Sequence, residues 1–127
     1  MGCIPGGNQQ RLIDDPYVTH YRILRYRVAG DSFFIRAQVI FQDAGTLHFS
    51  EYGEYDANGV YEVITYSFHW MDSSNTLRWR WDKAPHYPKL AGYPHHVHSG
   101  SDENNPVPGE PMNLFKVLDR IAEEIHE

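Results

Sequence analysis

Residues 17–82 consist of short runs of alternating apolar and polar positions, separated by segments that favour turns. The clearest run is 32–41, in which every second residue is apolar. Such alternation is typical of a strand that buries one of its faces. The whole pattern predicts five strands, at 17–29, 32–41, 46–52, 60–71 and 76–82.

The connections between the predicted strands are short. Gly30-Asp31 supplies a two-residue hairpin turn, and segments rich in Asp, Asn and Gly separate the later strands. Successive strands joined in this way form an antiparallel meander. Near the end, apolar residues recur at helical spacing over 112–126. The predicted fold is therefore α+β, an antiparallel meander of about five strands with a C-terminal helix packed on one face.

Strand parity assigns side chains to the two faces of the sheet. Glu51 shares a row with Leu47 and Phe49, so it is either buried or placed past the edge of the core. In the fourth strand the expected core row is Val60, Ile64, Tyr66, Phe68 and Trp70. In the fifth strand one face is expected to hold Leu77, Trp79 and Trp81, and the other Arg78, Arg80 and Asp82.

The two ends of the chain differ from this pattern. Residues 1–16 are polar and contain Pro and Gly, which predicts a flexible arm ahead of a single domain at 17–127. Residues 99–111 are also rich in Pro and Gly and are expected to form an exposed loop. Pro111 suits the first position of the C-terminal helix.

The net charge is informative about binding only when residues 1–100 and 101–127 are considered separately. The 127 residues carry a net charge of −6, which argues against broad non-specific binding of nucleic acid. Residues 1–100 hold nine Lys/Arg and ten Asp/Glu, whereas 101–127 hold two and seven. The acidity therefore belongs to the tail, and a local anion site in the nearly neutral body stays open. A single cysteine, Cys3, and the lack of a long apolar run predict a cytoplasmic protein without membrane contact.

The candidate chemistry lies within residues 66–98, which hold five of the eight His. If the fourth and fifth strands pair, His69 lies near Arg78 or Arg80. Imidazole and cationic groups on one sheet face could bind an anion and transfer protons near neutral pH. On the first strand, Arg22, Arg25 and Arg27 are interpreted as solvated, with extension of a basic face left open.

Two kinds of site fit this cluster. One is a metal-independent phosphodiesterase, with one His as base, another as acid, and Arg80 stabilising charge at phosphorus. The other is a metal site made by His96 and His98 with a carboxylate, Asp82 or Glu51. Structural interpretations also stand, with Arg80 and Asp82 as an ion pair and His86 as an ordinary loop residue. The residue pattern alone leaves these alternatives open.

The segment R-W-D-K-A-P-H-Y-P at 80–88, followed by P-H-H-V-H at 94–98, resembles the signature of the TumE family of toxin–antitoxin proteins. The family pattern is an R-Y/W-D-N motif followed by a His-rich H-x-H, preceded by an aromatic strand and closed by a short helix. The resemblance extends from about Tyr17 onward. Lys83 departs from it, because the family usually has Asn there.

The resemblance implies a toxin encoded beside a helix-turn-helix antitoxin, acting on RNA or translation, with endoribonuclease activity as the leading expectation. We expect no cofactor and no metal, RNA as substrate, and no membrane partner, and we leave a homodimer open. The expected catalytic residues are His96, His98, Asp82 and His86. The expected substrate-binding residues are Arg80, Arg78, His69 and Glu51. The alternative is a non-catalytic module that docks a partner protein or an anion through the same Arg/His cluster.

Overall fold

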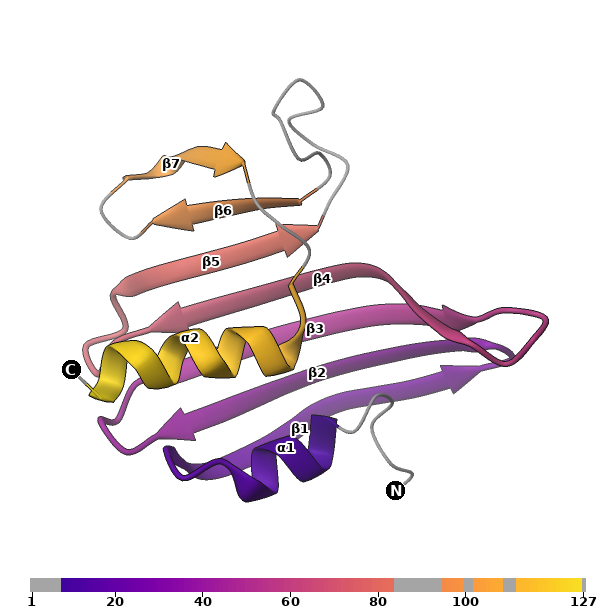
Figure 1. The fold of residues 1–127 in the computed structure, drawn as a ribbon, viewed down its shortest axis with the longest axis horizontal. Helices are drawn as coiled ribbons and strands as arrows, with labels where there is room; N and C mark the ends of the chain where they lie inside the picture. Colours follow the sequence, from indigo (N-terminus) through magenta and orange to yellow (C-terminus); the bar gives the residue numbers. More distant parts are fainter. Residues whose placement is uncertain (1–7, 84–94, 100–101, 109–111, 127) are drawn as a thin grey trace.

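The computed structural model describes residues 8–83, 95–99, 102–108 and 112–126, and within them a single antiparallel sheet runs in sequence order from β1 to β7 (Figure 1). The strands are β1 (Val18–Ala29), β2 (Ser32–Phe41), β3 (Thr46–Tyr55), β4 (Tyr61–Met71), β5 (Leu77–Lys83), β6 (His95–Ser99) and β7 (Asp102–Pro108). The helices are α1 (Asn8–Asp14) and α2 (Leu114–His126). The α+β meander with a C-terminal helix is confirmed, with five strands where predicted and two more beyond them.

Two segments expected to be irregular take part in the fold. Residues 102–108, expected within an exposed loop, form β7, the edge strand beside β6. An edge strand tolerates Pro106 and Pro108, because an edge needs fewer backbone N–H donors than the interior of a sheet. Residues 8–14, expected within a flexible arm, form α1, whose Leu12 is buried in the core.

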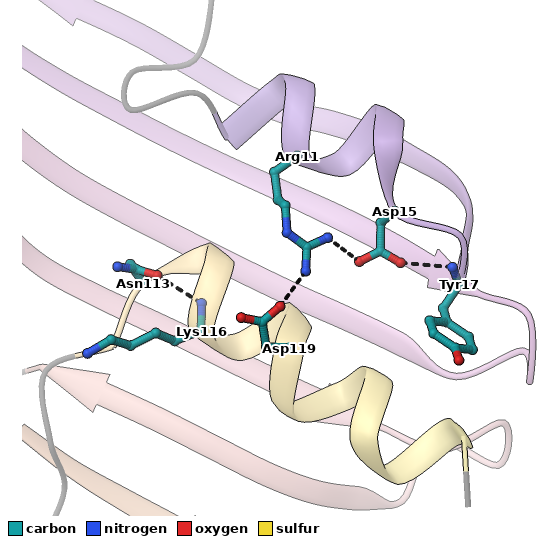
Figure 2. Close-up of polar contacts among 6 residues, drawn as sticks. All are labelled: Arg11, Asp15, Tyr17, Asn113, Lys116 and Asp119. Atoms are coloured by element: carbon teal, nitrogen blue, oxygen red, sulfur yellow. Dashed lines mark hydrogen bonds and ion pairs between the residues drawn. The ribbon is translucent and has the colours of Figure 1, made fainter.

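Polar contacts fix α1 and the start of α2 (Figure 2). Arg11 pairs with Asp15 and, at 2.7 Å, with Asp119 of α2, and so links the two helices. The carboxylate of Asp15 also accepts a hydrogen bond of 2.8 Å from the backbone N–H of Tyr17. Asn113 caps α2, since its side-chain oxygen accepts from the backbone N–H of Lys116 at 2.9 Å. Pro111, expected to open this helix, lies outside the described residues.

The core lies between the sheet and the two helices, which cover the same face (Figure 1). Alternate residues of β2 and β3 point into it, as the sequence pattern predicted. The apolar face of α2 completes it with Leu114, Val117, Leu118 and Ile121. Neither described helix is long and apolar enough to cross a membrane.

Bulges correct two of the predicted strand faces. In β4, Ile64 is an extra residue between the pairs Tyr52–Thr65 and Gly53–Val63. The parity of the strand changes there, so Tyr61 and Val63 pack against the core. Val60, expected in the core row, is 59% exposed.

In β5, Arg78 is the extra residue, because Trp79 pairs with Trp70 and Leu77 pairs with Met71. The Arg78 guanidinium lies 4.1 Å from the centre of the Trp70 ring and 3.4 Å from the Asp43 carboxylate. Arg78 therefore sits beside the core residue Trp70, and not with Arg80 and Asp82 as predicted. By the same bulge, Leu77 is displaced from the face that Trp79 occupies.

Candidate functional site

Cross-strand pairing aligns polar side chains on the face of the sheet turned away from α1 and α2, here called the polar face. One row joins neighbouring strands through the partners Gln38, His48, His69, Arg80 and His98. The next row runs through Arg36, Ser50, Ser67 and Asp82, and the backbone of Asp82 pairs with that of His96 on β6. Directly opposed residues of antiparallel strands have Cβ atoms about 5 Å apart, so each row brings its side chains together. Of the two neighbours predicted for His69, Arg78 and Arg80, the structure confirms Arg80.

Arg80, Asp82 and His98 form the centre of the site. Arg80 Nε donates to Asp82 Oδ2 at 2.9 Å, and Arg80 Nη2 lies 3.1 Å from His98 Nε2. His98 Nε2 lies 3.5 Å from Asp82 Oδ2. The His98 side chain is 2% exposed and that of Asp82 is 10% exposed, whereas Arg80 keeps 28%. The guanidinium is thus the most accessible of the three groups and is held by two more deeply buried ones.

These contacts restrict the proton on His98. A guanidinium N–H can only donate, so the contact between Arg80 and His98 requires a lone pair on Nε2. A protonated Nε2 would instead favour the Asp82 carboxylate. The imidazole thus lies between a permanent cation and an anion, an arrangement suited to orienting Arg80 or to transferring a proton.

A hollow of about 440 Å³ opens next to this group. It is lined by Ser50, Thr65, Tyr66, Ser67, His69, Arg80, Asp82 and Lys83. The Ser hydroxyls, the imidazole and the guanidinium offer hydrogen-bond donors on one side of the sheet. Such a donor set suits an anion with several oxygens, for example a phosphodiester.

Lys83, which departs from the resembled motif, uses its ammonium for a structural contact. Lys83 Nζ donates to the backbone carbonyl of Val63 at 3.0 Å. This bond ties β5 to β4 close to the bulge at Ile64. The residue that replaces the expected Asn thus contributes to the wall of the hollow.

Glu51 was expected among the substrate-binding residues, but it lies on the opposite, helix-covered face. Glu51 is only 3% exposed, and Tyr61 Oη donates a hydrogen bond to Glu51 Oε2 at 2.9 Å. Burial raises the pKa of Glu51, and the hydrogen bond from Tyr61 opposes that rise only in part. Burial, followed by the nearby Glu51 charge, also raises the pKa of Tyr61. The sheet separates this pair from Arg80.

Gly53 makes the contact between Tyr61 and Glu51 possible. A Cβ atom at Gly53 would lie 2.3 Å from Tyr61 Oη and 2.4 Å from Cζ, well inside van der Waals contact. The Tyr61 ring therefore crosses β3 above Gly53 to reach Glu51. The buried Glu51 carboxyl is therefore part of the core packing and is separate from the polar face.

The predicted site residues thus divide into three groups. Arg80, Asp82, His69 and His98 come together, whereas Arg78 and Glu51 do not. His96 pairs with Asp82 through the backbone of β6, but its side chain lies outside the described part of the molecule. His86 lies wholly outside the described residues.

Sequence reasoning missed His48, Ser50 and Ser67. All three lie on the polar face: His48 pairs with His69, Ser67 pairs with Asp82, and Ser50 pairs with Ser67 and lines the same hollow. The signal was available, because extending the parity of the predicted strands across β3 and β4 puts His48 next to His69. Among the side chains that the structure describes, no three His, Cys, Asp or Glu residues gather in a group that could hold a metal ion.

Comparison with known proteins gives one match. The profile of a protein family described as "Toxin TumE" matches residues 8–127. The match spans almost the whole chain, including α1, and it confirms the resemblance seen in the motif at 80–98. No curated protein and no solved structure matches significantly.

Proposed function

The chain belongs to the TumE toxin family, and from this premise we propose that it is the toxin of a prokaryotic toxin–antitoxin module that cleaves RNA without a metal ion. The observation that carries the chemical part is the group of Arg80, Asp82 and His98 beside the hollow on the polar face. A guanidinium held by a carboxylate and an imidazole is oriented before any ligand arrives. Preorganised donors of this kind stabilise the charge that develops at phosphorus.

In the proposed reaction Arg80 binds the non-bridging oxygens of the scissile phosphate. A base removes the proton of the ribose 2′-hydroxyl, and the 2′-oxygen attacks phosphorus. The bond from phosphorus to the 5′-oxygen breaks, and an acid gives that oxygen a proton. The products are a 2′,3′-cyclic phosphate and a 5′-hydroxyl, so no water, oxidant or cofactor is consumed.

Burial helps to distribute the roles among the histidines. His69 lines the hollow and directly neighbours Arg80, so we assign it one of the two proton transfers. His98 is almost fully buried, which favours a positioning role toward Arg80 together with Asp82. His96 pairs in register with Asp82, and we propose it for the second proton transfer. His86 stays a further candidate from the motif.

A second candidate function is docking of an anionic partner without catalysis. The observation that favours it is that Arg80 is held in place by Asp82 while its side chain stays 28% exposed, which suits binding and requires no reaction. In either case the expected protein partner is the cognate helix-turn-helix antitoxin, and the expected compartment is the cytoplasm. A homodimer is not needed for the proposed site.

The test is RNA cleavage by the purified full-length protein in the presence of a chelator. His69→Ala is expected to reduce the cleavage rate by about 100-fold, the usual contribution of a general acid or base. His20→Ala is the matched control, because His20 is an exposed histidine at the far edge strand β1. Its rate should equal that of the parent.

Three results would count against the proposal. Undiminished cleavage by a folded His69→Ala variant would remove His69 from the reaction. Cleavage that depends on added metal would overturn the metal-independent mechanism. No cleavage of any RNA, together with a tight stoichiometric antitoxin complex, would favour the docking function.

A further inference from the structure

The polar face carries a second group of cations, on β1 and β2, which the proposed reaction does not use. Arg22, Arg25 and Arg27 would not all share a face of a regular strand, because their spacing changes parity. Leu24 is an extra residue between the pairs Ile23–Ala37 and Arg25–Arg36. This bulge brings all three arginines to the polar face and leaves Leu24 46% exposed.

The arrangement works against stability. Arg25 and Arg36 are directly paired across β1 and β2, and like charges in that position repel. Among the described residues, no carboxylate forms an ion pair with Arg22, Arg25, Arg27 or Arg36. Arg22 Nη2 donates to Gln38 Oε1 at 3.3 Å, a neutral partner. The repulsion would be relieved by an anion.

Aromatic rings accompany these cations. Arg27, Phe34 and Tyr52 are successive partners across β1, β2 and β3. With Arg25, Ala29 and Ser32 they line a hollow of about 420 Å³. Arg36 also lies over the Phe34 ring, 5.9 Å from its centre. Partly exposed rings beside guanidinium groups suit unpaired bases, which stack, and phosphates, which take the charge.

We propose that this arginine patch, made of Arg25, Arg27, Phe34, Arg36 and Tyr52, binds single-stranded RNA and leads it to Arg80. The row of Arg36, Ser50, Ser67 and Asp82 connects the two hollows across β2 to β5. Three strand spacings separate its ends, about 14 Å. This distance suits a strand of about four nucleotides, the lower end of site sizes in small single-strand-binding folds.

The inference rests on the proposed function, since it names the form of RNA that the reaction takes. The observations favour RNA over an acidic protein segment, because the rings lie within a hollow lined by arginine. A protein interface of useful strength would instead need a larger apolar centre. Duplex RNA also fits poorly, because its bases are not available for stacking on Phe34 or Tyr52.

Binding is measured by fluorescence anisotropy with a labelled 2′-O-methyl oligouridine. This probe lacks the 2′-hydroxyl nucleophile, so binding is separated from cleavage. The double variant Arg25→Gln/Arg36→Gln is expected to lose at least about tenfold in affinity. The slope of log affinity against log salt should become shallower by about 1.4, the contribution of two contacts to a single strand. Duplex RNA should bind more weakly than the single strand to the parent protein.

The control is Lys116→Gln/Arg120→Gln on α2, which removes the same charge from the opposite side of the sheet. Its affinity should stay close to that of the parent. Thermal unfolding checks the fold, and Arg25→Gln/Arg36→Gln should be at least as stable as the parent, since it loses a like-charge pair.

The outcomes separate this inference from the proposed function. Unchanged binding by Arg25→Gln/Arg36→Gln, with cleavage still dependent on His69, would overturn the arginine patch and keep the reaction. An equal loss of oligouridine affinity in both double variants would show that only net charge matters, and would also overturn the arginine patch. An antitoxin that binds the patch while the oligouridine does not would replace RNA by a protein. Absence of both binding and cleavage would overturn the proposed function itself.

Discussion

The two faces of this sheet use ionisable residues in opposite ways. On the helix-covered face, Glu51 is enclosed and meets a neutral donor, Tyr61, so burial favours its protonated form. On the polar face, Asp82 is also buried, but it meets the Arg80 guanidinium and the His98 imidazole. Burial alone therefore does not distinguish the carboxylate proposed for the site from the one in the core. The charge of its partners, and their access to a hollow, make the distinction.

The largest expected difference between the faces concerns stability. Phe68 is fully buried and stacks on Phe49, so Phe68→Ala should lower the free energy of unfolding by about 3–5 kcal/mol. His48→Ala, on the polar face, should change it by no more than about 0.5 kcal/mol. Denaturant unfolding of both variants checks this. Equal losses would mean that the polar face is also part of the core.

A smaller effect, visible only against pH, is expected at Glu51. The pKa of Glu51 is higher in the fold than its ordinary value of 4.5, so above that pH the folded chain binds more protons than the unfolded one. Stability attributable to Glu51 therefore falls as the pH rises from about 4.5 through the folded pKa. The substitution Glu51→Gln keeps a hydrogen-bond acceptor for Tyr61 but cannot ionise, so the stability of the variant should not fall with rising pH at this position.

The variant Glu51→Gln should thus match the parent near pH 4 and exceed it at pH 8, by on the order of 1 kcal/mol. Urea unfolding at both pH values measures the difference. A variant that is less stable than the parent at pH 8 would show that Glu51 is ionised and needed in the fold. The two faces would then no longer differ in the way described.

Much of the fold follows from local pattern. The alternation in 32–41 fixed the core row of β2, and the helical spacing of Leu114, Val117 and Ile121 fixed the packed face of α2. Parity also predicted His69 near Arg78 or Arg80, and the structure pairs it with Arg80. These results depend only on periods of two and about 3.6 residues, which short segments already contain.

The errors come from single extra residues and from long-range contacts. Bulges at Leu24, Ile64 and Arg78 change the parity of their strands, and the local sequence contains no residue that predicts them. Arg78 was therefore assigned to the wrong face. Leu12 joins the core beside α2, and its neighbour Arg11 pairs with Asp119, more than a hundred positions away. Such a pairing leaves no local pattern in the chain.

The central claim is that the polar face carries the chemistry, and two arginines of one strand test it most directly. Arg80 lies in the hollow of the polar face, whereas Arg78, two positions earlier, lies on the other side with Trp70 and Asp43. The measurement is RNA cleavage by Arg80→Lys and Arg78→Lys, each keeping its charge but losing the planar fork. We expect Arg80→Lys to be slower than the parent by about 100-fold and Arg78→Lys to be unchanged. A folded Arg80→Lys protein that cleaves as fast as Arg78→Lys would contradict the account.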